Sequence, residues 1–193
     1  MAGLYTVVLA AGGSRRLGEP KQLLKKRRET LLVSALQTAH GITPGRVVVV
    51  LGARRARLRL VLQRWSGPDT RVVDNSQWRT GMASSLARGL AALPANCTAS
   101  LLLLVDQPAI TARALHRLMR VARTHPNKLV AAHYSGHPGV PAIIPRRYWR
   151  EIRKLSGDQG ARSVLRARGA DLLTVAMPEA SWDIDEPADL ITL

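Results

Sequence analysis

The sequence contains one cysteine, no phenylalanine, few acidic residues and no long apolar run. Cys97 has no second cysteine to pair with, so nothing indicates an oxidising compartment. The apolar run at 101–105 is far too short to span a bilayer and is typical of a buried strand. The first residues lack the basic and apolar regions of a signal peptide, and we expect a cytoplasmic protein that binds no membrane.

Acidic residues are outnumbered by basic ones, 13 against 29, which gives a formal net charge of +16. This surplus is typical either of a protein that attracts anions or of a solvated Arg-rich surface. The basic residues are spread over several expected helices, and only 4% of residues are aromatic. The pattern argues against nucleic-acid binding and favours a solvated surface with general attraction for anions.

Apolar strand-like runs alternate with longer helical patterns along the whole chain. The expected strands are 5–10, 46–51, 71–74, 100–105, 128–133, 140–144 and 171–175. The expected helices are 30–40, 54–65, 82–93, 111–124, 146–155, 159–168 and 186–191, with Thr111 as an N-cap. This alternation predicts one α/β domain over residues 1–193, with a doubly wound, mostly parallel sheet. Ligands of such sheets bind beyond the carboxyl ends of the strands.

The segment after the first expected strand combines glycines with basic side chains. It is LAAGGSRRLG from Leu9 to Gly18, followed by Lys21. Glycines let a backbone approach phosphate oxygens, and Arg and Lys neutralise them. The segment fits neither the Walker A pattern nor a dinucleotide-binding fingerprint. On its residues alone it is either a phosphate loop or a Gly-rich turn with basic neighbours.

Carboxylates are placed where a metal ion could use them. Asp106 follows five apolar residues at the end of an expected central strand, although it could instead cap the next helix. Asp183 and Asp185 point to one face if their segment is extended, and a cation would relieve their repulsion. For Asp185, capping the last helix is the strong alternative. Oxygen ligands of this kind suit Mg²⁺.

Five segments together resemble the nucleotidyltransferase superfamily that includes the molybdenum-cofactor guanylyl- and cytidylyltransferases. They are the LAAG segment with Lys21, NSQW with Gly81 and Ser85, VDQP at 105–108, GDQGAR at 157–162 and DIDEPADL at 183–190. The resemblance covers nearly the whole chain and is strongest to the cytidylyltransferase branch. It implies a three-layer, Rossmann-like fold of the nucleotide-diphospho-sugar transferase type, with Mg²⁺ as cofactor.

The resemblance also implies roles for particular residues. Nucleotide-binding residues are expected at Leu9, Ala10, Ala11, Gly12, Gly13, Ser14, Arg16, Lys21, Asn75, Gly81 and Ser85. Catalysis is expected to involve Arg16, Lys21 and Asp106, and metal binding Asp106, Asp183 and Asp185. The acceptor is expected to contact Gln107, Gly139, Pro141, Asp158 and Arg162, although Asp158 and Arg162 could simply pair within one helix.

The implied reaction transfers CMP from CTP to molybdopterin and releases pyrophosphate. Ala11 stands where the guanylyltransferase branch typically has glycine, and its methyl group leaves less room for a purine. The family pattern has His before Pro near the acceptor, whereas this chain has Val140 there and His137 earlier. The departure at Val140 leaves another phosphorylated acceptor open, such as a sugar or polyol phosphate. GTP as the nucleotide and a non-catalytic cofactor carrier are two further alternatives. A molybdoenzyme that receives the cofactor is a further possible partner.

Overall fold

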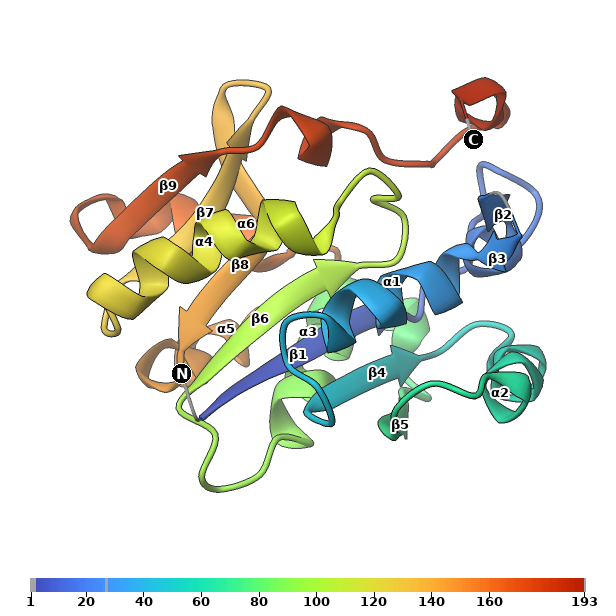
Figure 1. Ribbon diagram of the computed structural model, residues 1–193, viewed down its shortest axis with the longest axis horizontal. Coiled ribbons are helices and arrows are strands. Elements are labelled where there is room, and N and C mark those ends of the chain that lie inside the picture. The colour runs from blue at the N-terminus through green and yellow to red at the C-terminus, as the bar shows by residue number, and fades with distance from the viewer. Residues whose placement is uncertain (1–2, 27, 193) are drawn as a thin grey trace.

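A seven-stranded sheet forms the centre of the molecule. The computed structural model describes residues 3–26 and 28–192. The strand order is β5 (Thr70–Asp74), β4 (Val47–Leu51), β1 (Leu4–Ala10), β6 (Ala99–Leu104), β8 (His137–Pro145), β7 (Leu129–Tyr134) and β9 (Leu172–Ala176). Strand β8 runs antiparallel to both neighbours, and all other pairings are parallel. The predicted mostly parallel α/β sheet is confirmed (Figure 1).

Helices cover both faces of this sheet, which gives three layers. On one face, α1 (Leu31–His40) and α4 (Ala112–Thr124) pack over the sheet. On the other face lie α3 (Met82–Ala91), α5 (Trp149–Ile152) and α6 (Ala161–Ala167). Side chains of β1 alternate between the two cores: Val8 belongs to the first and Val7 to the second. The strands are apolar throughout because both faces are buried.

Threonine caps fix the starts of two of these helices. The Thr30 hydroxyl accepts a hydrogen bond from the Val33 amide, and Thr111 does the same for Ala114. The predicted N-cap at Thr111 is therefore confirmed. Both helices begin at fixed residues beside the carboxyl edge of the sheet.

Several short elements differ from the predicted pattern. A two-stranded hairpin, β2 (Lys25–Lys26) with β3 (Glu29–Thr30), was not predicted. The predicted helix at 146–155 is a 3-10 turn, Arg146–Tyr148, followed by the four-residue α5. The predicted helix at 186–191 is a 3-10 helix over Pro187–Thr192. Further 3-10 turns cover Lys21–Leu23, Trp78–Thr80, Gly169–Asp171 and Pro178–Ser181.

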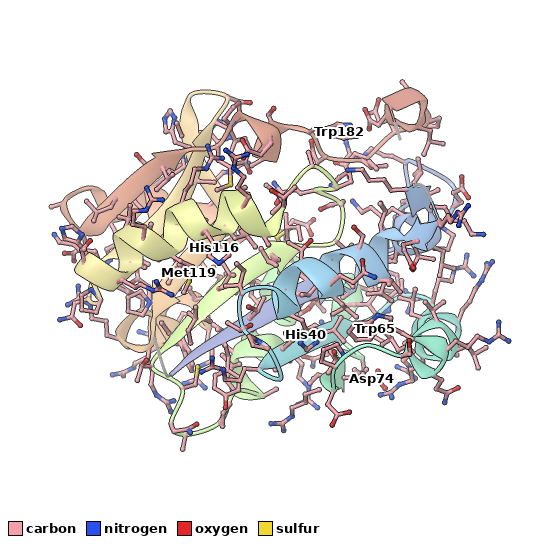
Figure 2. All side chains as sticks on the ribbon, in the orientation of Figure 1. His40, Trp65, Asp74, His116, Met119 and Trp182 are labelled. Atoms are coloured by element: carbon pink, nitrogen blue, oxygen red, sulfur yellow. The ribbon has the colours of Figure 1, made fainter. Side chains whose placement is uncertain are left out.

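Helix α2 (Arg55–Arg64) contributes its buried Leu58 to the first core. It lies at the edge of the molecule, past the end of β4 (Figure 1). Figure 2 shows nitrogen-tipped side chains spreading outward from this part of the molecule. Across the described residues, every helix is too short or too polar to cross a membrane.

Candidate active site

The loop that follows β1 is held in shape by one buried glutamine. The Gln22 side-chain amide donates to the carbonyls of Ala10 (3.0 Å) and Gly12 (2.8 Å), and Gln22 is only 1% exposed. The Lys21 amide donates to the Ser14 hydroxyl at 3.0 Å. These bonds close the loop between β1 and the Lys21–Leu23 turn and fix the course of its backbone. We call residues 11–20 the phosphate loop.

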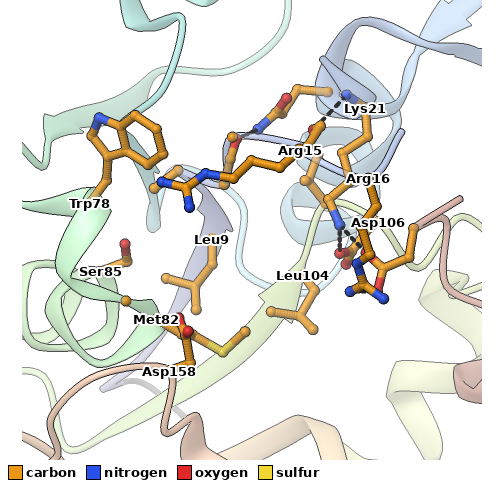
Figure 3. A pocket seen from close by; sticks show the side chains of 18 of the residues that line it. Leu9, Arg15, Arg16, Lys21, Trp78, Met82, Ser85, Leu104, Asp106 and Asp158 are labelled. Atoms are coloured by element: carbon orange, nitrogen blue, oxygen red, sulfur yellow. Dashed lines mark hydrogen bonds and ion pairs between the residues drawn. The ribbon is translucent and has the colours of Figure 1, made fainter. Parts of the chain in front are cut away.

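Lys21 lies between two carboxylates beside the phosphate loop. Its ammonium group donates to Asp106, to Asp185 Oδ1 at 2.8 Å and to the Ile184 carbonyl at 3.3 Å. Arg16 pairs with the other oxygen of Asp185 at 2.8 Å. Asp106 is 85 residues and Asp185 is 164 residues away from Lys21 in the sequence, yet both carboxylates bind its ammonium group (Figure 3).

The surroundings shift the pKa values of this cluster in opposite directions. Burial lowers the pKa of Lys21, but the charges and hydrogen bonds of Asp106 and Asp185 outweigh it and raise that pKa overall. Burial also raises the pKa of Asp185, yet bonding to Lys21 and the charge of Arg16 leave it below the ordinary value. The pKa of Asp183 is raised, first by burial and then by the charges of Asp106 and Asp185.

The carboxylates fit a divalent cation. Asp106 Oδ1 is buried and has no hydrogen-bond partner, and Asp183 carries the repulsion of two nearby carboxylates. Oxygen donors in this state suit Mg²⁺ or Mn²⁺, which take one or two carboxylates and complete their shell with phosphates and water. Residues 3–26 and 28–192 contain no group of three or more His, Cys, Asp or Glu side chains placed to hold a metal ion.

A cavity of about 350 Å³ opens between the phosphate loop and α3 (Figure 3). Its walls come from Leu9, Ala11, Gly12, Gly13, Ser14, Arg15, Arg16, Lys21, Gln22, Trp78, Arg79, Gly81, Met82, Ser85, Leu104, Val105, Asp106, Asp158 and Asp185. We call it the first cavity. It brings together nine of the eleven residues expected to bind nucleotide. Ala10 and Asn75 do not line it.

Asn75 supports the first cavity from behind. It is buried, and its amide donates to the hydroxyls of Ser84 (2.8 Å) and Ser85 (3.0 Å). Its oxygen accepts from the Gln77 amide at 3.0 Å. Asn75 thus orients Ser85, whose side chain faces the cavity (Figure 3).

A second cavity, of about 580 Å³, adjoins the first. The two share Arg16, Lys21, Met82, Leu104, Asp106, Asp158 and Asp185. The second is completed by Gln107, Tyr134, Ser135, His137, Val140, Gly160, Ala161, Arg162, Ser181 and Asp183. The junction of the two cavities is therefore the Lys21 cluster with Asp158 opposite.

Three of the expected acceptor residues, Gln107, Asp158 and Arg162, line the second cavity. Asp158 and Arg162 form no ion pair with each other in the part of the chain that the structure describes. Gln107 donates to the carbonyls of Val140 (3.0 Å) and Ala180 (2.8 Å) and so fixes two walls together. Gly139 and Pro141 lie in β8 outside both linings, with Gly139 packed against the Tyr134 ring.

Comparison with known proteins agrees with this geometry. Residues 6–172 match the family model described as the MobA-like NTP transferase domain. The chain belongs to this family. This MobA-like transferase is thus a nucleotidyltransferase, and its phosphate loop, Asp106 and every residue that lines the first cavity except Asp185 lie within the matched range.

Relatives of the transferase carry several names. A nicotine blue oxidoreductase from Paenarthrobacter nicotinovorans is 34% identical, with 93% of this chain and 90% of that protein covered. A probable molybdenum cofactor guanylyltransferase from Opitutus terrae is 29% identical, covering 97% of this chain and 94% of that protein. The solved structure of Rv0371c from Mycobacterium tuberculosis H37Rv gives a TM-score of 0.81 at 28% identity, covering 98% of this chain and 95% of that chain. A manganese complex of Rv0371c gives a TM-score of 0.78 at 27% identity, covering 98% and 97%.

Some residues of the transferase's site were not expected from sequence. Gln22 and Trp78 are the clearest, because Gln22 shapes the phosphate loop and the Trp78 ring lies against Gly13. Arg79 stacks its guanidinium on Trp78, 4.5 Å from the ring centre. Tyr134 and His137 were not expected in the acceptor region either. Two of these residues gave a signal in the sequence: Trp78 as an aromatic residue within a matching segment, and His137 as a histidine displaced from the position before Pro141.

Proposed function

We propose that this transferase moves CMP from CTP to the terminal phosphate of molybdopterin and releases pyrophosphate. The observation that supports it is the pair of adjoining cavities that meet at Lys21, Asp106 and Asp185. A transfer between two phosphorylated molecules needs two binding spaces that share one charged junction. The proposal includes a cytoplasmic location, since no feature of the chain calls for another.

The chain's own groups perform most of the reaction by positioning and charge neutralisation. An acceptor phosphate oxygen attacks the α-phosphorus of CTP, a new P–O bond forms, and the bond to the bridging oxygen of pyrophosphate breaks. The phosphate loop, Arg16 and Lys21 hold the triphosphate and balance the charge on the leaving group. No general base is required because the attacking phosphate is already an anion.

Asp106 and Asp183, with Asp185 beside them, would hold the divalent cation. Bound there, Mg²⁺ supplies positive charge to the phosphate oxygens as bonds change. Lys21 occupies part of the same carboxylate cluster, so nucleotide and cation binding would redistribute its hydrogen bonds. The choice of Mg²⁺ over Mn²⁺ is part of the proposal.

Ala11 supports the choice of a pyrimidine. It is 5% exposed and lines the first cavity beside Leu9 and Gly12. A methyl group at this wall takes space that a larger purine ring would need. The Ala11→Gly variant should therefore gain activity with GTP relative to CTP.

The test is pyrophosphate release from CTP, GTP, ATP and UTP, each with and without molybdopterin, in Mg²⁺. The proposal expects release with CTP that depends on molybdopterin and is lost in Asp106→Ala. Release with GTP but not CTP would overturn the nucleotide assignment. Release with CTP and a sugar or polyol phosphate, but not with molybdopterin, would overturn the acceptor assignment.

The 34% identical oxidoreductase makes a second candidate, a redox reaction at the same site. It predicts that the protein turns over nicotine blue with an added electron donor or acceptor and leaves all four triphosphates intact. A non-catalytic cofactor carrier would instead bind molybdopterin equally well in wild type and Asp106→Ala, with no turnover in either. Each outcome differs from CTP-dependent pyrophosphate release.

A further inference from the structure

Helix α2 presents a strongly basic outer face. We define the α2 face as the exposed residues Arg54, Arg55, Arg57, Leu60 and Arg64. The helix contains no acidic residue. Leu60 is 55% exposed, one of two large apolar side chains that stand out among the described residues in this way. It lies opposite the buried Leu58, with Arg57 and Arg64 beside it on the same side of the helix, while Arg54 and Arg55 lie at the N-terminal end of α2.

Folding does not explain this composition. Leu58 is the one fully buried residue of α2, and the helix lies at the edge of the molecule (Figure 1). Arg54, Arg55 and Arg57 sit at the helix N-terminus, where the helix dipole disfavours positive charge. Arg55 and Arg59 are four residues apart and repel each other. A helix selected only for stability would carry acids at these positions.

The charges of the α2 face are also not neutralised by neighbours. Arg59, beside the face, pairs with Asp74 at 3.1 Å. Within residues 3–26 and 28–192, no carboxylate forms an ion pair with Arg54, Arg55, Arg57 or Arg64. With a net charge of +16, the rest of the chain does not supply the missing negative charge. An anionic partner would neutralise the face.

We propose that the α2 face docks an acidic surface of a partner protein that covers Leu60 with an apolar contact. A nucleic-acid backbone would neutralise the arginines but leave Leu60 in water, and α2 has no aromatic side chain for base stacking. A membrane-surface helix needs a broad apolar face, and α2 offers one exposed leucine. An acidic protein surface can neutralise the arginines and also remove Leu60 from water.

The segment that leads into α2 contacts the wall of the first cavity. The Ala53 amide donates to the Ala11 carbonyl at 3.0 Å, and Gly52 packs against Trp78. Arg54 follows directly, so the N-terminal end of the α2 face is its part nearest to the first cavity. Together with the proposed function, on which this step alone rests, the placement fits a protein that receives the modified cofactor.

The docking can be tested without turnover, so its outcome is separate from that of the proposed function. The probes are two fluorescein-labelled, glutamate-rich helical peptides of equal length and charge, one with a leucine stripe and one with alanine in its place. Binding to the full chain is followed by fluorescence anisotropy at about 0.1 M salt, where charges within about 10 Å still interact.

The α2 variant Arg55→Gln/Arg57→Gln/Arg64→Gln should bind the leucine peptide at least about tenfold more weakly than wild type. The matched control is Arg113→Gln/Arg120→Gln/Arg123→Gln on α4, which removes equal charge from exposed positions and should change binding less than about threefold. Leu60→Ser should weaken binding of the leucine peptide about fivefold and leave the alanine peptide unchanged. Glutamine suits a helix, and far-ultraviolet circular dichroism checks that all variants fold.

Three results would overturn the docking proposal. Equal losses in the two triple variants would show attraction by net charge alone. An unchanged affinity of Leu60→Ser for the leucine peptide would remove the apolar contact. Displacement of the peptide from wild type by random duplex DNA of equal charge, with a steep salt dependence, would assign the face to nucleic acid.

Discussion

Lys21 does two things at once in this site: it lines both cavities and it balances two carboxylates. Its side chain is largely buried, and the raised pKa keeps it charged across the neutral range. A permanent positive charge at the junction of the cavities serves a reaction in which phosphate charge moves from one side to the other.

Replacing Lys21 with alanine should therefore lower kcat for pyrophosphate release by about 10²- to 10³-fold, the size expected when one fixed charge at a reacting phosphate is removed. The measurement is the initial rate at saturating nucleotide and acceptor. Lys25→Ala is the control, because Lys25 is exposed on β2 and lines neither cavity. A folded Lys21→Ala protein with kcat within threefold of wild type would remove Lys21 from the reaction.

Cys97 differs from Lys21 in that burial keeps its side chain uncharged and unreactive. Its thiol is 1% exposed, donates to the Ala99 carbonyl at 3.2 Å, and has its pKa raised by burial to about 11 from 9.0. A pKa higher by this amount leaves about 100-fold less thiolate at pH 8. Native protein should react with a disulfide reagent at pH 8 at least 100-fold more slowly than protein in denaturant. Equal rates in the two states would contradict this.

The raised pKa of Cys97 makes the stability of the folded protein depend on pH in the alkaline range. The folded state holds the Cys97 proton more tightly than the unfolded state, so this contribution is complete below pH 9.0 and is lost as the pH rises toward about 11. Cys97→Ser should show a smaller loss of stability over that alkaline range than wild type. Denaturant midpoints at pH 8 and pH 10.5 give the comparison.

At the scale of elements, the long strands and helices were predictable because their apolar periodicity is strong. Strands β1, β4 and β6 and helices α1, α3 and α4 appear within a few residues of their predicted bounds. The carboxyl ends of parallel strands then place Asp106 beside the phosphate loop, as expected. The proximity of Asp106 to the phosphate loop therefore follows from the order of the strands and from where β1 and β6 end.

Other elements could not be predicted from local pattern. Strands β2 and β3 have two residues each, too few to show alternation. The antiparallel direction of β8 is invisible in an apolar run, because a strand buried on both faces reads alike in either direction. Gln22 was missed because its role depends on burial against the carbonyls of Ala10 and Gly12.

Gly81 joins two elements that are far apart in sequence. It has φ of 113° and lies against the backbone of Gly157, whose carbonyl accepts from the Ala83 amide at 3.1 Å. A Cβ at Gly81 would overlap the Gly157 carbonyl group. This contact holds the loop that carries Asp158 over the first cavity.

Gly81→Ala should cost about 2 kcal/mol through the unfavourable φ, and more through the overlap. For a chain of this size the Tm should fall by at least about 4 °C, measured by differential scanning calorimetry. Displacement of the Asp158 loop should also raise KM for both substrates. Gly169→Ala is the control, because nothing lies within 4 Å of its added Cβ. A wild-type Tm for Gly81→Ala would show that the two loops are not in contact.

At the scale of the whole molecule, the net charge of +16 is the dominant feature. The described residues form some ion pairs, such as Arg117 with Glu179 and Arg168 with Glu151, but the acids are too few to balance the surface. Self-repulsion of this kind destabilises a compact state. The same positive charge attracts triphosphates and other anions to the protein surface in general. A local surface such as the α2 face therefore needs an apolar contact in addition if it is to select one anionic partner.

Stability should therefore rise with ionic strength. Added salt shortens the screening length from about 30 Å at 0.01 M to about 8 Å at 0.15 M, and repulsion between distant arginines falls accordingly. The Tm at pH 7 should increase steadily over this range. In Arg113→Gln/Arg120→Gln/Arg123→Gln the increase should be smaller, because three of the repelling charges on α4 are gone. If screening is the cause, the Tm should rise with ionic strength by similar amounts in sodium chloride and in sodium fluoride. A Tm that falls with salt would mean that attractive pairs, and not the cationic surplus, dominate the electrostatics of the fold.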